Sequence, residues 1–360
     1  MSEDRSGAGD DAPARPARRP NVKDVAALAG VSWKTVSNVV NGTAPVRDST
    51  RERVQQAIDQ LGYRPNAAGR NLRQGRSRLL ALAIPEIRLA YFADLAHAVI
   101  LAAKARGYTV LIDETFAEPG HEQVVAEGFR VDLLDGVIFS PQALADSDLV
   151  AAGGRLPMVM LGEATLPVDG GAAAADHVVI DNVASAREAT EHLIASGRRR
   201  IGFLGVRATE TNGTGVLRHA GYVAALEAHG LPTEAFPAPT YSRPGGAEVV
   251  GGLLDRFTGP DPLDALVCAN DLLAIGAMHV LRAAGLRVPD DVAVLGWDGT
   301  EDGIYSNPTL TTVAPDLSAL AELAVDLVLA RVDGSTATPQ VHTVGHRLIV
   351  RESTNGHLGN

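Results

Sequence analysis

The stretch VKDVAALAGVSWKTVSNVVNGTAPV, residues 22–46, decides the fold of the N-terminal part of the chain. Its apolar residues recur at helical spacing in two runs, first Val22, Val25, Ala26 and Ala29, then Val36, Val39 and Val40. Asn21 and Ser32 stand at the N-cap positions of these runs, and Gly30 lies between them. The pattern predicts two short helices joined by a tight turn.

The next segment, STRERVQQAIDQLGY at residues 49–63, predicts a third helix. Its apolar stripe consists of Val54, Ala57, Ile58 and Leu61. Ser49 and Glu52 have the spacing of a capping box, in which each side chain accepts a backbone N–H of the other. Three short helices with a glycine turn between the first two form a helix-turn-helix. The alternative is a small helical bundle whose polar face is merely solvated.

The predicted second helix turns polar side chains outward, namely Trp33, Lys34, Ser37 and Asn38. Lys34 can donate to guanine, Asn38 can pair with adenine, and Trp33 offers an indole donor with an apolar face. We expect three further side chains to contact phosphates, which position a domain on DNA without reading its sequence: Ser32, Thr35 and Arg47.

The net charge of −11 conceals an asymmetry, because residues 1–78 carry +6 and the rest of the chain −17. A basic end suits a polyanionic partner such as DNA. Residues 1–20 mix Pro, Gly, Ala and charges without an apolar run, so we expect a disordered tail rather than a signal peptide. No later stretch reaches about 18 uninterrupted apolar residues, which predicts a cytoplasmic protein without a membrane span.

These N-terminal motifs resemble a known family. VKDVAALAGVSWKTVSNVVNG, followed by VRDSTRERVQQAIDQLGYRPNAAGRNLRQGRS, is similar to the headpiece of LacI/GalR bacterial transcription regulators, without a gap through residues 22–77. The resemblance implies a near-palindromic double-stranded DNA operator and a homodimer. It also implies a hinge helix that forms on DNA and wedges open the minor groove through Leu72, with Asn66, Ala67, Ala68, Gly69 and Arg70 around it.

Two residues depart from the family pattern. Asn38 stands where most relatives carry Arg, so the base read at this position stays open. Gly69 stands where Ala is usual, which weakens the hinge helix by about 1 kcal/mol.

From residue 79 onward, strand and helix patterns alternate, which predicts two parallel α/β units. The expected strands are LLALAIPE, TVLIDE, DGVIFSP and PMVMLG, then VVID, RIGFLGV, PTYS, ALVCAN and VAVLGWDG. The segment PTLTTVAPDLSALAELAVDLVLARV resembles the family's return into the first unit, and HRLIVREST the last strand of the second. The fold class expected is therefore α/β, a helix-turn-helix headpiece and hinge helix followed by a two-subdomain periplasmic-binding-protein-like body.

The expected organisation divides the chain into five parts. They are a tail at 1–20, a DNA-binding domain at 21–64, a hinge helix at 65–77, a first effector subdomain at 78–176 and 309–334, and a second at 177–308 and 335–354. Three crossovers between the subdomains predict a body that can open and close around a ligand.

Doubly wound sheets bind ligands at the carboxyl ends of their strands. Asn270 follows one expected strand, Trp297 and Asp298 end another, and Arg218 lies early in a helix. Carboxylate and guanidinium groups can bind vicinal hydroxyls, and an aromatic face can stack on a sugar ring, which favours a sugar or sugar derivative over a purine. The family resemblance supports Arg218, Asn270 and Asp298 and adds Tyr91 and Phe92. Asp181 is a further candidate, unless it only caps the following helix.

Rival functions find less support in the sequence. The chain has no GxxxxGK[ST], no GxGxxG after the first strand, no HExxH and no GxSxG, so we do not expect an enzyme, a cofactor or a metal site. A solute-binding receptor is a rival for the body alone, but it has no use for a DNA headpiece. No leucine heptads follow the last strand, so a dimer is expected rather than a tetramer. Whether an effector induces or corepresses stays open.

Overall fold

A computed structural model of the chain describes residues 20–41, 44–63, 76–128, 133–144, 148, 156–162, 173–206 and 213–355. The chain divides into two compact units, Met1–Arg76 and Ser77–Asn360. We refer to the first as the headpiece and to the second as the body. The predicted tail lies outside the described residues except for Pro20.

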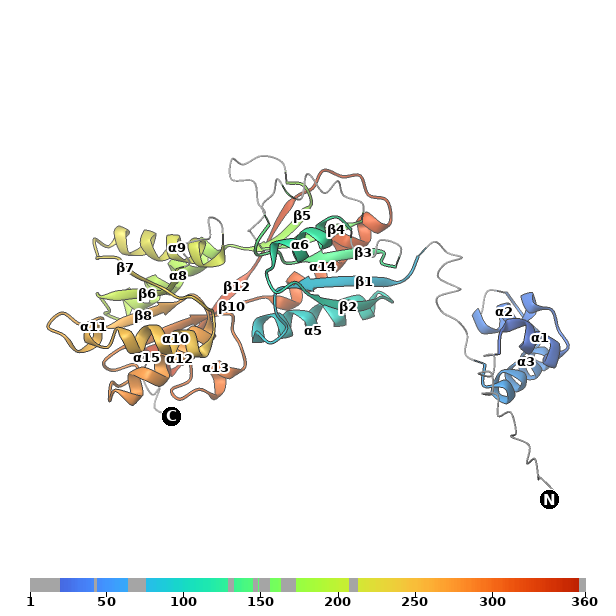
Figure 1. The fold of residues 1–360 in the computed structure, drawn as a ribbon, viewed down its shortest axis with the longest axis horizontal. Coiled ribbons are helices and arrows are strands. Elements are labelled where there is room, and N and C mark those ends of the chain that lie inside the picture. The colour runs from blue at the N-terminus through green and yellow to red at the C-terminus, as the bar shows by residue number, and fades with distance from the viewer. Residues whose placement is uncertain are drawn as a thin grey trace, which may run out of the picture. The chain divides into compact units, whose positions relative to one another are not determined.

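The headpiece contains the three predicted helices, α1 (Val22–Ala29), α2 (Trp33–Asn41) and α3 (Asp48–Leu61) (Figure 1). Their predicted apolar faces meet in one small core, built around Val25, Val36 and Val54. Asn21 caps α1, because its side chain accepts hydrogen bonds from the backbone N–H groups of Lys23 and Asp24. These contacts confirm the helix-turn-helix pattern.

The predicted capping box of the third helix is wrong. Helix α3 begins at Asp48, one residue earlier than expected, and its N-cap residue Arg47 makes no side-chain capping bond. Ser49 therefore lies inside the first turn, where a capping box with Glu52 is impossible.

The body contains two six-stranded sheets, with helices on both faces of each (Figure 1). The first sheet is parallel throughout and has the order β11-β5-β4-β3-β1-β2. Its strands are β1 (Leu79–Ile84), β2 (Thr109–Glu114), β3 (Gly136–Phe139), β4 (Met158–Leu161), β5 (Asp176–Ile180) and β11 (Val341–Val344). Along β1, Leu80 and Leu82 join one apolar core while Ala81 and Ala83 join another on the opposite face, as the period of a doubly covered strand requires.

The second sheet has the order β12-β10-β9-β8-β6-β7, and only β12 runs antiparallel to its neighbour. Its strands are β6 (Ile201–Val206), β7 (Glu234–Pro237), β8 (Ala265–Cys268), β9 (Ala293–Trp297), β10 (Thr311–Pro315) and β12 (His346–Ile349). The strand predicted from PTYS is wrong, since β7 precedes it and Ser242 instead caps the next helix.

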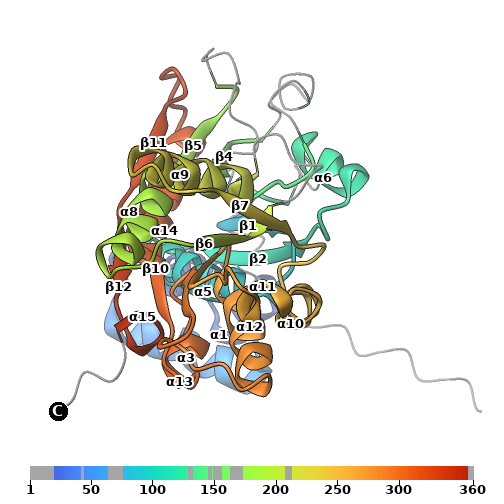
Figure 2. The ribbon, with the colours of Figure 1, turned by 90° about the vertical axis from the view of Figure 1, so that its left-hand side faces the viewer.

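The helices of the body follow the expected alternation with the strands. They are α5 (Ala90–Ala105), α6 (Pro119–Ala126), α8 (Asn182–Ala195), α9 (Thr214–Ala228), α10 (Arg243–Gly252), α11 (Asp255–Thr258), α12 (Asp271–Ala283), α13 (Asp302–Tyr305), α14 (Leu317–Val332) and α15 (Glu352–Asn355). Helices α5 and α14 pack together against the first sheet. Helices α8 and α9 cover one face of the second sheet, and α10 and α12 the other (Figure 2).

The chain crosses three times between the two sheets, but not at the expected boundaries. Strands β5 and β11, which we expected in the second subdomain, pair in the first sheet, and β10, expected in the first, pairs in the second. The crossings therefore fall near 181, 316 and 345. The second and third are joined directly, because Asp316 donates its backbone N–H to the carbonyl of Gly345 at 3.0 Å.

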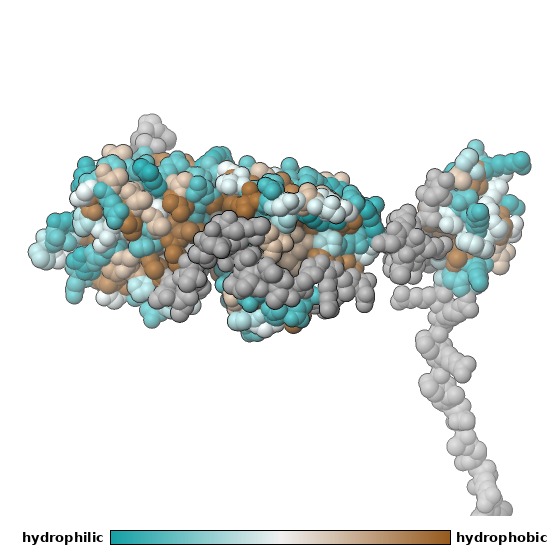
Figure 3. Space-filling view, turned by 90° about the horizontal axis from the view of Figure 1, so that it is seen from above, coloured by the Kyte–Doolittle hydropathy of each residue, from teal (hydrophilic) through white to brown (hydrophobic). Residues whose placement is uncertain are grey.

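The surface of the body mixes hydrophilic side chains with apolar patches (Figure 3). Among the described residues, no helix has the length and apolar character that a membrane span requires.

The entry to β11 rests on a buried ion pair. Asp176 is 3% exposed and accepts hydrogen bonds from Arg331 Nε at 2.8 Å and from the backbone N–H of Gln340 at 2.9 Å. The Arg331→Ala variant leaves this carboxylate buried without its cation, so the free energy of unfolding of the body should fall by about 3 kcal/mol. The exposed pair of Arg187 and Glu191 provides the control, since Arg187→Ala should cost less than about 0.5 kcal/mol. Equal losses in urea unfolding would contradict this role of Asp176.

Candidate DNA-binding and effector sites

The outward face of α2 carries the predicted DNA-reading side chains. Trp33 is 51% exposed, Lys34 is exposed, and Ser37 and Asn38 are half-buried. A half-exposed Trp on a small headpiece is unusual for a side chain of this size, and it places a large apolar surface beside a cation. The helix can therefore present both a donor and a flat apolar contact to one partner.

The start of α2 is held by two hydroxyls. The Oγ atom of Ser32 accepts a hydrogen bond from the backbone N–H of Thr35 at 3.1 Å and bonds to its Oγ1 at 2.9 Å. Ser32 and Arg47 are both exposed, at the starts of α2 and α3. They keep the placement at helix N-termini that favours contact with phosphates. The predicted hinge residues Asn66, Ala68, Gly69 and Leu72 lie outside the described residues.

Arg218 is the best anchored residue of the predicted effector site. It lies on α9, is 6% exposed, and donates from Nε to Asn182 Oδ1 at 2.8 Å and from Nη1 to the carbonyl of Ala269 at 2.5 Å. Its guanidinium carbon lies 3.4 Å from the centre of the Trp297 ring, which is a stacked cation–π contact. A change of the Arg218 rotamer would therefore break two hydrogen bonds and the cation–π contact together.

Trp297 has a different role from the one expected. Its side chain is 2% exposed, one face carries Arg218, and its Nε1 donates to Ser185 Oγ at 3.3 Å. The indole therefore supports Arg218 and offers almost no surface on which a sugar could stack.

Asp298 ends β9 and lies 3.9 Å from Arg218 Nη1, with a side chain that is 10% exposed. Its backbone has a φ of 121°, a conformation that costs a non-glycine residue about 1–3 kcal/mol and is concentrated at functional sites. No described residue donates a hydrogen bond to its carboxylate. Burial raises the pKa of Asp298 well above its ordinary value, Arg218 opposes the shift, and Asp271 and Asp94 add to it.

Asp271 is a buried carboxylate whose oxygens accept hydrogen bonds within the fold, in contrast to those of Asp298. It accepts hydrogen bonds from Thr312 Oγ1 at 2.6 Å and from the backbone and hydroxyl of Thr300 at 2.8 and 3.0 Å. Burial raises its pKa to about 6, against the lowering effect of these hydrogen bonds. Asp271 thus fastens α12 to β10 and the loop after β9, whereas Asp298 has acceptor capacity left for a ligand.

The two predicted aromatic residues of the first subdomain, Tyr91 and Phe92, start α5. Both are half-buried and meet edge to face at 5.1 Å. Asp94, one turn further along, has its pKa raised by burial and by Glu301, which precedes α13. Asp94 also makes a small contribution to the raised pKa of Asp298. Tyr91 and Phe92 belong to the same helix as Asp94, within three residues of it.

The remaining two predicted residues are helix caps. Asn270 Oδ1 accepts from the backbone N–H of Leu273 at 2.9 Å, and its Nδ2 donates to the carbonyl of Tyr241 at 3.4 Å. Asp181 is exposed and caps α8 by accepting from the backbone N–H of Ala184 at 2.8 Å. Asn270 directly follows Ala269, whose carbonyl accepts a hydrogen bond from Arg218. Asp181 caps its helix, which was the alternative to a role in effector binding.

Two residues that orient Arg218 and Trp297 were missed in the sequence. Asn182 and Ser185, both on α8, are 3% and 0% exposed and bond to Arg218 and Trp297 respectively. The feature of the sequence that could have pointed to Asn182 is its place directly after Asp181, at the end of a strand, where the structure buries it.

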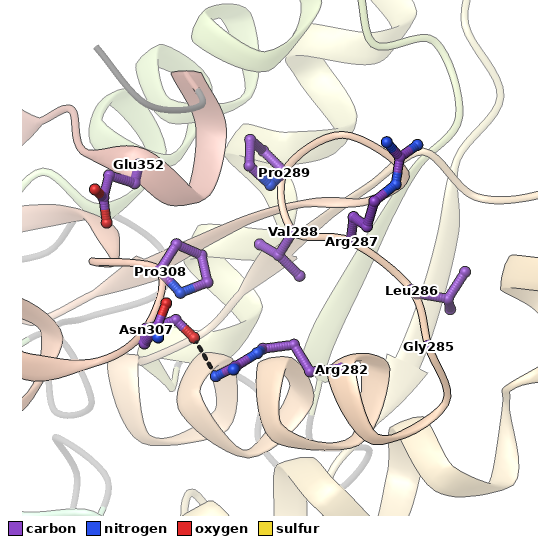
Figure 4. A pocket seen from close by; sticks show the side chains of 9 residues that line it. All are labelled: Arg282, Gly285, Leu286, Arg287, Val288, Pro289, Asn307, Pro308 and Glu352. Carbon is purple, nitrogen blue, oxygen red and sulfur yellow. Dashed lines mark hydrogen bonds between the residues drawn. The ribbon is translucent and has the colours of Figure 1, made fainter. Parts of the chain in front are cut away.

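A pocket of about 350 Å³ opens elsewhere on the second subdomain (Figure 4). It is lined by Arg282, Gly285, Leu286, Arg287, Val288, Pro289, Asn307, Pro308 and Glu352. Arg282 reaches across it to the carbonyl of Asn307 at 2.6 Å. None of the predicted effector residues lines this pocket.

Comparison with known families gives two matches. Residues 21–66 match the family described as bacterial regulatory proteins, lacI family, and residues 190–354 match a periplasmic binding protein-like domain. The first range covers the headpiece helices, and the second contains all six strands of the second sheet as well as Arg218, Asn270 and Asp298.

Individual relatives extend over nearly the whole chain. The HTH-type transcriptional regulator CelR of Thermobifida fusca is 35% identical over 93% of this chain and 98% of its own. The solved complex of the transcriptional regulator CelR with cellobiose is 31% identical, with a TM-score of 0.65 over 93% and 100% of the two chains. The lac repressor dimer bound to operator and an anti-inducer is 26% identical, with a TM-score of 0.81 over 94% and 99%. The chain belongs to the lacI family of bacterial regulatory proteins.

Proposed function

We propose that this protein is a cytoplasmic transcriptional repressor without catalytic activity, which binds a near-palindromic operator as a homodimer and responds to a sugar-like effector. The observation that carries the proposal is the presence, in one chain, of a helix with exposed polar side chains that suit DNA and of a body in which an anchored guanidinium lies beside a carboxylate that is only 10% exposed. The first suits base edges and phosphates, and the second suits a polyhydroxylated ligand.

The effector would bind between Arg218 and Asp298 of the second subdomain and Tyr91 and Phe92 of the first. Asp298 can accept hydrogen bonds from vicinal hydroxyls, and Arg218 can donate to their oxygens. Since Trp297 is covered by Arg218, an apolar sugar face would instead stack on Tyr91 or Phe92. The cellobiose bound by CelR makes short glucosides the first ligands to test.

The coupling between the two sites would run through the body. An effector that touches both subdomains favours one relative orientation of the sheets, and the first subdomain leads directly into the headpiece. A 100-fold preference for one orientation shifts the operator-binding population by about 2.7 kcal/mol, which is a usual allosteric coupling. If the effector favours the orientation in which the two headpieces fit the two half-sites, it strengthens operator binding. If it favours the other orientation, it weakens operator binding.

The homodimer is supported by exposed apolar side chains on the first subdomain. Leu101 on α5, Ile112 on the edge strand β2 and Phe116 just after it are 53%, 43% and 60% exposed. A second copy that covered them would remove this apolar surface from water.

The first test is selection of genomic DNA fragments by the purified protein at fixed salt. We expect a near-palindromic sequence to be enriched, because two headpieces would read two half-sites. If no sequence is enriched either alone or with cellobiose present, the proposed function is wrong.

The selected operator then tests the hinge. Replacing Leu72 by Ala should weaken operator binding at least tenfold, because the minor-groove wedge is lost, and should leave binding to unrelated DNA within twofold. Anisotropy titrations with both DNAs measure this difference. Equal losses on the two would show that Leu72 has no role in operator recognition.

Asp298→Asn tests the effector site. We expect this variant to lose at least tenfold in cellobiose affinity by calorimetry, because an amide cannot replace both acceptor oxygens, with operator affinity unchanged. The same change should raise the free energy of unfolding by about 1 kcal/mol, because the raised pKa of Asp298 means that the cost of taking its charge out of water exceeds the attraction of Arg218, and a neutral amide avoids this cost. Asp271→Asn is the matched control and should be destabilised instead. If Asp298→Asn bound cellobiose with wild-type affinity, the assignment of Asp298 to the effector site would be wrong.

The raised pKa of Asp298 gives the stability gain a pH dependence. Its folded pKa lies above its ordinary value of 3.8, so its contribution to stability is complete below that value and is lost as pH rises through the folded pKa. The melting temperature of Asp298→Asn should therefore exceed that of wild type by more at pH 8 than at pH 4. A constant difference would mean that Asp298 titrates alike in the folded and unfolded chain.

A further inference from the structure

One carboxylate of the body binds the backbone at the start of the body. Asp135, just before β3, accepts three hydrogen bonds from the first two residues of the body. Its Oδ1 accepts from the backbone N–H of Ser77 at 2.6 Å and from the Ser77 hydroxyl at 2.9 Å, and its Oδ2 accepts from the backbone N–H of Arg78 at 2.9 Å. Both carboxylate oxygens are thus engaged where the chain enters the body.

The same contacts fix an uncommon backbone conformation. Arg78 has a φ of 59°, in the left-handed region that non-glycine residues seldom adopt. Its guanidinium lies 5.0 Å from the ring centre of Tyr108, and its carbonyl accepts from the backbone N–H of Thr109 at 3.0 Å. Such a conformation persists only where its surroundings hold it, and here the surroundings include Asp135, Tyr108 and Thr109.

An equivalent clamp exists in the second sheet. Asp264, just before β8, accepts from the backbone N–H of Arg199 at 2.9 Å and from that of Arg200 at 3.1 Å, just before β6. In both sheets a buried Leu precedes the aspartate, Leu134 in the first and Leu263 in the second. The same arrangement thus joins the starts of the neighbouring strands β1 and β3 in one sheet and β6 and β8 in the other. The two copies differ in what they hold, because Arg199 and Arg200 only join α8 to β6, whereas Ser77 and Arg78 join the headpiece to the body.

We propose that Asp135 is a positioning residue for operator binding, which fixes the direction in which the segment toward the headpiece leaves the body. The inference rests on the proposed function as a dimeric operator-binding regulator. Two headpieces can occupy two half-sites together only if each leaves its body in a suitable direction, since the effective concentration of the second headpiece depends on this geometry. Binding to unrelated DNA relies on phosphate contacts without a fixed half-site spacing and makes no such demand.

The test compares Asp135→Asn with Asp264→Asn in the full-length protein. Each variant keeps the shape of the side chain but turns an NH₂ group toward a backbone N–H, so both should lower the melting temperature to a similar extent. Anisotropy titrations then measure affinity for the operator from the genomic selection and for an unrelated duplex of the same length and salt. We expect Asp135→Asn to lose tenfold or more on the operator and less than twofold on the unrelated duplex, with Asp264→Asn within twofold on both.

The milder variant Ser77→Ala covers the case in which Asp135→Asn does not fold. It removes one of the three hydrogen bonds and should weaken operator binding about threefold, with unrelated DNA unaffected; operator affinity equal to wild type would overturn the proposal. So would equal operator losses in Asp135→Asn and Asp264→Asn. A wild-type protein without operator preference would overturn the proposed function first, and the role of Asp135 with it.

Discussion

The three crossings of the chain between two sheets are the constraint on which the chemistry of the body depends. They tie together the two halves of the body, so that α5 of the first half and the loop after β9 in the second belong to one compact unit. The crossings are few, and two of them are joined by the bond between Asp316 and Gly345. A change in the relative orientation of the halves is therefore confined to a small number of residues, as in hinge-type closure.

The parts of the fold that depend on local pattern were predicted well. The three headpiece helices follow from apolar residues at helical spacing and from the caps at Asn21 and Ser32, all of which act within a few residues. The start of α3 was missed by one residue, because Asp48 and Ser49 are both plausible at a helix N-terminus. The same limit explains β7, where a short and half-exposed segment left the strand pattern weak.

Membership in a sheet could not be predicted in the same way. The patterns around β5, β10 and β11 indicate strands, but an apolar run does not specify which partner it pairs with. That choice is made by contacts distant in sequence, such as the hydrogen bonds that join Asp176 at the start of β5 to Arg331 and Gln340. The expected subdomain boundaries therefore failed at the crossings.

In the candidate effector site, Arg218 and Asp298 were predicted from their places at a helix start and a strand end, with support from the family resemblance, whereas the contacts of their neighbours needed the structure. Trp297 was expected to face a ligand because aromatic residues often stack on sugars, yet it is buried beneath Arg218. Asn182 was passed over in favour of the exposed Asp181 beside it, although Asn182 is the residue that orients the guanidinium. Asn182 is buried and can reach Arg218 on α9, whereas Asp181 is exposed. This difference in burial depends on a helix that is distant in the sequence.

The body uses one kind of group, a partly or fully buried aspartate, for different purposes according to what surrounds it. Asp271 accepts three hydrogen bonds and so stabilises the fold, while Asp298 lies in a strained backbone conformation with only a cation 3.9 Å away. A charge whose pKa is raised in the folded protein lowers stability, which supports the proposed role of Asp298 as an acceptor for a ligand. Asp135 and Asp264 differ in the same sense, because identical chemistry holds a loop in one half and the boundary with the headpiece in the other. The functional roles that we propose for Asp298 and Asp135 rest on these differences in surroundings, because the chemistry of the carboxylate is the same in all four residues.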